Sequence, residues 1–170
     1  MKYIYGIMLM LLSFLCVAQD ISIPGTGISF NAPNKFDKLP QEIIDVKWPK
    51  KNAPKWAIGN KTASTTIAYD LKPHDISNAP LNKLKESFVS LFNRMIPGIS
   101  WKQTKIVTIS GKKWLHLEMT SNAIDTDIYN IMLVTSYGKQ MLTFNFNSTK
   151  SDFKNYETAL RKSIGSIEIK

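Results

Sequence analysis

The chain of 170 residues is basic, with 22 lysines and arginines against 13 acidic residues and a formal net charge of +9. This length fits one domain with a single hydrophobic core. The lysines are scattered in runs of at most two, which favours a generally basic surface over a dedicated anion site. The single cysteine excludes a disulfide framework within the chain.

The first eighteen residues have the features of a secretory signal peptide. Lys2 is followed by an apolar run from 7 to 17, and small residues precede a cleavage position after Ala18. Cleavage there would leave Gln19 as the new N-terminus and would lower the net charge to +8 by removing Lys2. We therefore predict a signal peptide over 1–18 and a single α+β domain over 19–170.

The predicted destination is outside the cytoplasm, in the periplasm or secreted. Lipidation of Cys16 is the alternative, but Leu15 directly before the cysteine fits lipoprotein processing badly. Export makes nucleic acid an improbable partner. No later stretch approaches the roughly 20 apolar residues of a membrane helix, so we predict no transmembrane span in the mature chain.

Two strands are predicted in the first half of the mature chain. In the first, Ile28 and Phe30 alternate with polar residues. In the second, "TASTTIAYDL" places β-branched and aromatic residues at alternate positions from Thr65 to Leu71. The loop between the strands is rich in proline and lysine.

That loop contains the candidate ligand-binding residues. The stretch "KWPKKNAPKW" carries Trp48, Lys50, Lys51 and Trp56. Aromatic faces can stack on sugars or bases, and lysines can hold an anion. The alternative interpretation is a connector whose tryptophans are anchored in the fold, since large aromatics are usually buried; under it Trp56 begins a strand and packs inward. Exposure of Trp48 beside a concavity would favour ligand binding.

A helix is predicted from Asn78, as its N-cap, to the "IPG" stop at 96–98. Its apolar residues recur at intervals of three and four and share one face: Leu81, Leu84, Phe88, Leu91, Phe92 and Met95. The helix is therefore predicted to be amphipathic.

The second half predicts an antiparallel meander and a closing helix. Four strands joined by short turns are expected in "KIVTIS", "KWLHLEM", "DIYNIMLV" and "QMLTFNFN". In the last of them Leu142, Phe144 and Phe146 face one way and polar residues the other, so one face should be packed more heavily. A helix with Ser151 as N-cap and a short final strand in "SIEIK" follow. The fold class is α+β, an antiparallel β-sheet flanked by helices.

This order of elements resembles the PsbP-like family of α/β/α sandwiches, which includes DcrB-type bacterial envelope proteins. The resemblance rests on "GISFNAP", the long helix near Asn78, the meander through "ISGKKWLHLEM" and "IYNIMLVTSYGKQMLTFNFN", and the helix "DFKNYETALRKSIGSI". It implies the fold, a place in the cell envelope and a non-enzymatic accessory or binding role. It transfers no catalytic, metal or partner-binding residue, and fold analogy is a weak functional warrant.

Signals of catalysis are sparse. His116 and Glu118 share a strand face and could be metal ligands or an acid-base pair, but surface or hydrogen-bonded strand residues are the preferred interpretation. There is no G-x-S-x-G motif, and no cysteine remains after cleavage. We therefore predict a protein that is not an enzyme and has no cofactor or metal.

The predicted function is an exported accessory or binding protein of the bacterial envelope. The expected partner is another envelope protein or a small anionic or carbohydrate ligand. The first rival is a binder of an anionic or carbohydrate ligand that uses Trp48, Trp56 and the neighbouring lysines. The second rival is an enzyme whose site is assembled from distant residues, which should show titratable groups converging in a cleft.

Overall fold

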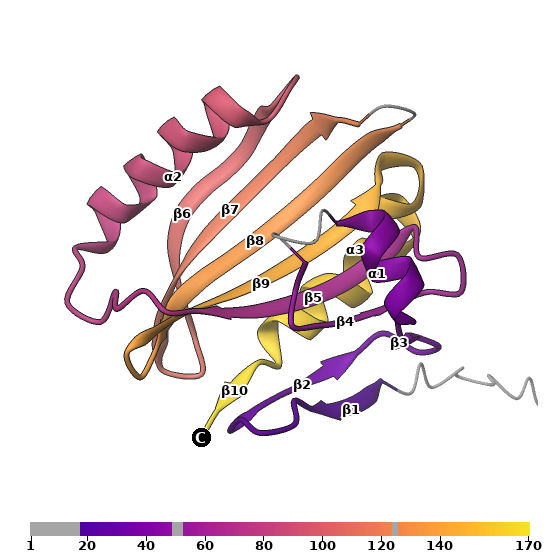
Figure 1. Ribbon diagram of the computed structural model, residues 1–170, viewed down its shortest axis with the longest axis horizontal. Helices are drawn as coiled ribbons and strands as arrows, with labels where there is room; N and C mark the ends of the chain where they lie inside the picture. The colour runs from indigo at the N-terminus through magenta and orange to yellow at the C-terminus, as the bar shows by residue number, and fades with distance from the viewer. Residues whose placement is uncertain (1–17, 49–52, 124–125) are drawn as a thin grey trace, which may run out of the picture.

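The computed structural model describes residues 18–48, 53–123 and 126–170, and Figure 1 shows their arrangement. Residues 1–17 of the predicted signal peptide lie outside the described residues, and so do Lys50 and Lys51. The helices are α1 (Gln41–Lys47), α2 (Leu81–Met95) and α3 (Lys150–Gly165). The strands are β1 (Gln19–Ser22), β2 (Ile28–Ala32), β3 (Asp37–Lys38), β4 (Trp56–Gly59), β5 (Thr65–Lys72), β6 (Ser100–Ile109), β7 (Lys112–Asn122), β8 (Asp127–Tyr137), β9 (Gln140–Thr149) and β10 (Glu168–Ile169).

Within these residues the strands form two antiparallel sheets. The larger has seven strands in the order β3-β4-β5-β9-β8-β7-β6, and the smaller has the order β1-β2-β10. The meander predicted from the sequence is β6 to β9. The final strand β10 pairs with β2, so the two ends of the domain meet in the small sheet. The α+β fold class and the antiparallel sheet are confirmed.

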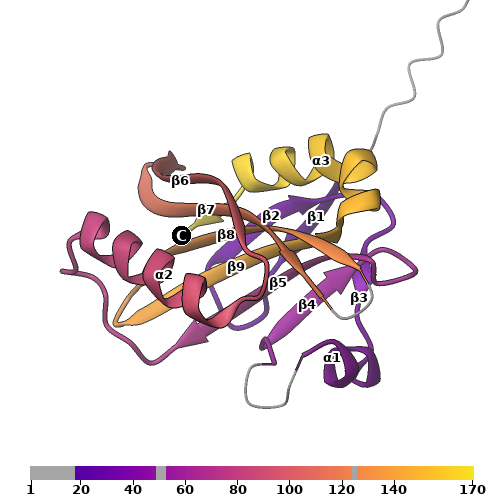
Figure 2. The same cartoon turned by 90° about the horizontal axis from the view of Figure 1, so that it is seen from above.

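The helices lie on opposite faces of the large sheet. Figure 2 shows α3 on one side and both α1 and α2 on the other. The small sheet shares the α3 side, where Phe30 of β2 meets Phe144 of β9 edge to face at 5.6 Å between ring centroids. This arrangement makes one face of the large sheet the main core.

The alternation of β9 explains why this face carries the core. Leu142, Phe144 and Phe146 point toward α3 and are almost fully buried. Successive side chains of a strand point to opposite faces, so the residues between them point toward α1 and α2. Those residues are only partly buried. The predicted difference between the two faces is therefore confirmed.

Helix α3 is held by both its cap and its apolar stripe. The side chain of Thr149 accepts a hydrogen bond from the backbone N–H of Asp152, so the N-cap is Thr149 and the predicted cap at Ser151 is wrong by two residues. Phe153, Leu160 and Ile164 are buried against the sheets.

Helix α2 differs from its prediction at one end and in its packing. It ends at Met95 as predicted, but it begins at Leu81 with Pro80 at the N-cap position and no side-chain cap, so the predicted cap at Asn78 is wrong. Its apolar face forms, yet no residue of the helix is buried. Because none of its residues is buried, α2 lies at the margin of the sheet and leaves part of its apolar stripe exposed to solvent.

Three elements were absent from the sequence prediction: β1, β3 and α1. The short helix α1 lies within the segment expected to be a loop, and Ile44 is its single buried residue. It places Trp48 directly after its end, where the backbone N–H of Trp48 bonds to the Ile44 carbonyl at 2.9 Å. Trp56 begins β4, as predicted.

Candidate ligand-binding trough

The face of the large sheet opposite α3 carries a trough that runs along β9. Its floor is the outward-facing row of that strand, namely Thr143, Asn145, Asn147 and Thr149. Neighbouring strands extend the floor with Ala68 and Met132, both directly across from Asn145. The seven strand residues from Thr143 to Thr149 span about 20 Å. The trough is therefore as long as a short extended ligand.

The walls of the trough come from the two helices on this side. On one side stand Phe88, Leu91 and Phe92 of α2. On the other stand Trp48, Ile43 and Val46, from α1 and its C-terminal end. The trough has two cavities, of about 470 Å³ beside α2 and about 640 Å³ beside α1. Trp48 lines both and therefore stands between them.

Exposed apolar side chains concentrate around this trough. Among the described residues, the large hydrophobic side chains that remain exposed are Ile43 (39%), Val46 (88%), Leu91 (37%) and Met95 (67%). All four belong to α1 and α2, and three of them line the trough. Such residues scattered singly need no explanation, but a group around one concavity indicates an interaction surface.

The cavity beside α1 contains a single ionisable side chain among its described lining residues, that of Lys47. Its ammonium donates to the Ala63 carbonyl at 3.0 Å and lies 5.7 Å from the centroid of the Trp48 ring. Burial lowers the pKa of Lys47 because desolvation disfavours the charged form. An anion bound in this cavity would supply the missing counter-charge.

The floor offers both paired and unpaired polar groups. The side-chain amide of Asn147 donates to the side-chain Oδ1 of Asn130 at 2.6 Å, so these two atoms are already paired. The Oδ1 atom of Asn145 is buried and has no hydrogen-bond partner among the described residues. At the α2 end, Asp70 forms an ion pair with Lys72, so their charges largely cancel. Because the Asn145 oxygen is closed off from solvent, a ligand lying in the trough does not reach it in this structure.

The structure separates the residues that the sequence suggested together. Trp48 is half-buried and lines the trough. Trp56 packs on the core, with its ring centroid 6.1 Å from that of Phe30 and 6.4 Å from that of Tyr69, and it lines a different cavity beside Lys38. The predicted inward packing of Trp56 is confirmed, and the two tryptophans do not share a site. Lys50 and Lys51 lie outside the described residues, so their ligand contact stays a prediction.

Lys47, the aromatic residues of α2 and the β9 floor were not predicted from the sequence as ligand contacts. The alternation in "LTFNFN" and the stripe of α2 were both read from the sequence, but only as packing signals. Their contribution to one surface depends on how α2 is placed beside the sheet, which no local pattern specifies.

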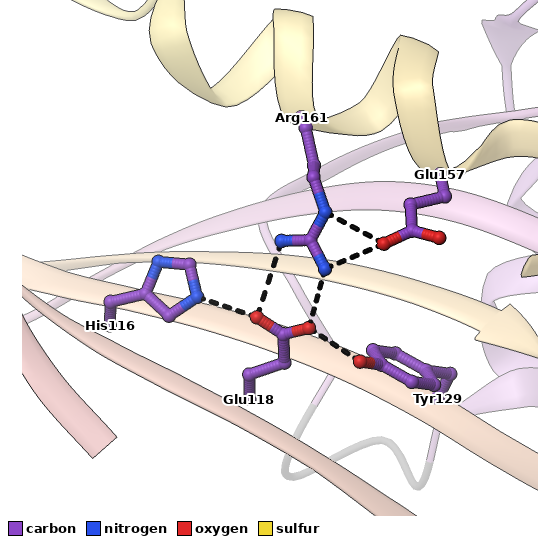
Figure 3. A network of polar contacts seen from close by, with 5 residues as sticks. All are labelled: His116, Glu118, Tyr129, Glu157 and Arg161. Atoms are coloured by element: carbon purple, nitrogen blue, oxygen red, sulfur yellow. Dashed lines mark hydrogen bonds and ion pairs between the residues drawn. The ribbon is translucent and has the colours of Figure 1, made fainter. Parts of the chain in front are cut away.

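A polar network lies on the opposite face of the sheet, beneath α3 (Figure 3). Glu118 of β7 is 1% exposed and receives hydrogen bonds from His116 at 2.9 Å, from Arg161 at 2.7 and 3.3 Å, and from Tyr129. Arg161 also bonds to Glu157 at 2.9 Å. His116 and Glu118 are therefore hydrogen-bonded strand residues, as one of the two preferred interpretations predicted, and the other, surface residues, is wrong because both side chains are buried.

This network is built as a structural clamp. Within the part of the chain that the structure describes, none of its five side chains lines the trough. The ring of Phe153 stacks on Tyr129 with 3.6 Å between centroids and covers one side of the network. No group of three or more His, Cys, Asp or Glu side chains among the described residues is placed to hold a metal ion. The network joins α3 to the sheet.

The network predicts how stability depends on pH. Burial alone would raise the pKa of Glu118, but hydrogen bonds from His116, Arg161 and Tyr129 outweigh burial and hold this pKa far below its usual value of 4.5. The stabilisation is therefore complete above pH 4.5 and is lost as the pH falls below it, by up to about 1.4 kcal/mol per pH unit.

We expect wild type and Glu118→Gln to differ most in free energy of unfolding near pH 7, and the difference to shrink as the pH falls from 4.5 toward 2. Urea denaturation at a series of pH values measures this difference. The exposed Glu86→Gln is the control and should follow the wild type throughout. A difference for Glu118→Gln that does not change with pH would contradict the prediction.

Comparisons with known proteins identify the fold. No protein-family model matches the sequence, and no curated protein sequence matches it. The chain is similar to the solution structure of cyanobacterial PsbP (CyanoP) from Synechocystis sp. PCC 6803, with a TM-score of 0.64 and 11% identity over 92% of this chain and 94% of that one. It is also similar to LpqN, described as involved in cell envelope biogenesis of Mycobacterium tuberculosis, with a TM-score of 0.58 and 13% identity over 90% of each chain.

These matches extend over nearly the whole chain and define an α+β protein with an antiparallel sheet flanked by helices. The protein has the PsbP-like fold that the sequence predicted. At 11% and 13% identity the likeness concerns the fold alone.

Proposed function

We propose that the protein is an exported, non-enzymatic accessory or binding protein of the bacterial envelope, and that the trough along β9 is its binding surface. The observation that carries this proposal is the gathering of exposed apolar side chains on α1 and α2 around one concavity. An exposed apolar group with this arrangement is costly in water unless a partner covers it.

Export is supported by the sequence and by the start of the fold. The predicted cleavage after Ala18 would leave Gln19 at the N-terminus, and Gln19 is the first residue of β1. The domain would therefore keep its first strand whole after processing. No helix within residues 18–48, 53–123 and 126–170 is long and apolar enough to cross a membrane. LpqN, which shares the fold, is described as an envelope biogenesis protein.

A non-enzymatic role is supported by the separation of charge from the cavities. The largest cluster of hydrogen-bonded titratable side chains, around Glu118, is buried under α3 on the far face of the sheet. The trough on the near face contains Lys47 and the paired Asp70 and Lys72. A cleft that performs acid-base chemistry would need its titratable groups to converge on a substrate.

Photo-cross-linking in the source organism tests the proposal. The photoreactive residue p-benzoylphenylalanine in place of Val46, which is 88% exposed and lines the trough, should capture an envelope component after irradiation. The same residue in place of Lys154, exposed on α3 on the opposite side, is the control and should capture none of it. Mass spectrometry identifies the adducts. Equal capture at both positions, or none at position 46, would refute the proposal.

A further inference from the structure

We infer that the trough binds an extended peptide segment of a partner protein, with an acidic group at the α1 end and apolar side chains toward α2. This inference rests on the proposed function and specifies the partner of the same surface. Three properties of the trough support a peptide: its charge, the spacing of its floor and the position of its apolar wall.

The charge of the trough favours an acidic group at one end. Lys47 lines the α1 cavity without a carboxylate partner among the described residues, and its own hydrogen bond goes to a neutral carbonyl. Thr62, Thr126 and Thr149 line the same cavity, but their hydroxyls already form hydrogen bonds within the chain, that of Thr149 as the N-cap of α3. An Asp, a Glu or a C-terminal carboxylate fits Lys47, because charge-assisted hydrogen bonds are the stronger kind.

The spacing of the floor matches an extended backbone. Thr143, Asn145 and Asn147 are two residues apart along β9, so their side chains repeat about every 7 Å. A peptide lying along β9 repeats its own N–H and C=O groups at nearly the same interval. An extended peptide can therefore keep one register along the whole floor.

The apolar wall decides which side chains the peptide carries. Phe88, Leu91 and Phe92 line the α2 cavity, and Trp48 stands between this cavity and the cation. Alternate residues of an extended peptide point the same way, so an apolar residue at every second position can pack on this wall. The expected sequence pattern is therefore acidic at one end and alternately apolar along the rest.

Selection from a phage-displayed library of random heptapeptides tests this inference on the purified protein. Seven extended residues span about 20 Å, the length of the floor from Thr143 to Thr149. Peptides that bind wild type should be enriched in one acidic residue with apolar residues at alternate positions. Enriched peptides are then synthesised with a fluorescent label, and their affinities are measured by anisotropy.

Two trough variants and two matched controls decide the result. Lys47→Met removes the cation and keeps most of the apolar stem, and Leu91→Asn places an amide on the α2 wall; each should weaken binding at least tenfold. Lys154→Met and Met95→Asn make the same changes outside the trough and should bind as wild type. The inference is overturned if no peptide distinguishes trough variants from controls, or if the enriched peptides carry no acidic residue.

Failure here is separable from failure of the proposed function. If the adduct at position 46 is a lipid or a glycan, the trough is still a binding surface, but its occupant is not a peptide. If that adduct is a protein, sequencing of the cross-linked segment must show the acidic and alternately apolar pattern. A protein cross-linked through a segment without this pattern would overturn the inference and leave the proposed function standing.

Discussion

Replacement of Phe144 by alanine is expected to lower the free energy of unfolding by about 4 kcal/mol. Phe144 is fully buried and lies at the centre of an aromatic cluster, with ring centroids 5.6 Å from Phe30, 6.1 Å from Tyr69, 6.3 Å from Trp114 and 6.2 Å from Phe146. It connects the large sheet to the small one. Truncation to alanine removes apolar contacts on all sides and leaves a cavity that surrounding rings cannot fill.

Urea denaturation followed by circular dichroism measures this loss, provided that the slope against urea concentration stays constant. The control is Phe88→Ala, the same change at a partly exposed position on α2. It should cost less than half as much, because only part of the Phe88 side chain is withdrawn from water. Equal losses for the two variants would mean that α2 is packed as firmly as the α3 face, contrary to the exposure of its apolar stripe.

The strands and their faces could be predicted from the sequence because the information is local. In β5 and β9 the period of two is set by apolar and aromatic residues such as Ile67 and Phe146, and the short turns at Gly111 and Gly138 fix which strands are neighbours. Both turn glycines have positive φ angles, of 77° and 55°, which glycine adopts at little cost. These signals set the β6–β7 and β8–β9 pairs, and the few residues between Asn122 and Asp127 bring the two pairs together.

The elements that the prediction missed depend on contacts between distant residues. Strand β1 exists because Gln19 to Ser22 pair with β2, and its own four residues show no strand pattern. Helix α1 has seven residues, too few for propensity to stabilise a helix alone, and it is held by the burial of Ile44 with Leu39, Ala57 and Ala68. These pairings are set by tertiary packing, which a single sequence does not display.

The candidate site, like the fold, could be predicted only in part from the sequence. The sequence drew attention to Trp48 because tryptophan and lysine are ligand-binding residue types, and Trp48 does line the trough. Its association with Trp56 came only from closeness in the chain, and the structure places Trp56 against the core. The floor at Asn145 lies nearly one hundred residues away in sequence, so only the pairing of β5 with β9 brings it near Trp48.

Arg161→Met is expected to lower the free energy of unfolding by about 3 kcal/mol. The methionine keeps much of the packing of the arginine stem over Phe153, whose ring centroid lies 6.0 Å from the guanidinium carbon. The variant loses the bonds of 2.7 and 3.3 Å to Glu118, whose side chain is 1% exposed. Without the arginine, the buried carboxylate keeps only His116 and Tyr129 as partners, and its pKa should rise.

Two further variants separate the buried charge from the other effects of the substitution. Glu157→Gln removes the second carboxylate bound to Arg161, but this side chain is 44% exposed, so the cost should stay below about 1 kcal/mol. Adding Glu118→Gln to Arg161→Met removes the uncompensated charge, so the double variant should be more stable than Arg161→Met alone. Urea denaturation at pH 7 measures all three. If the double variant were instead less stable than Arg161→Met, the loss would come from the geometry of the α3 contact rather than from the stranded carboxylate, and the proposed electrostatic origin of the clamp would be wrong.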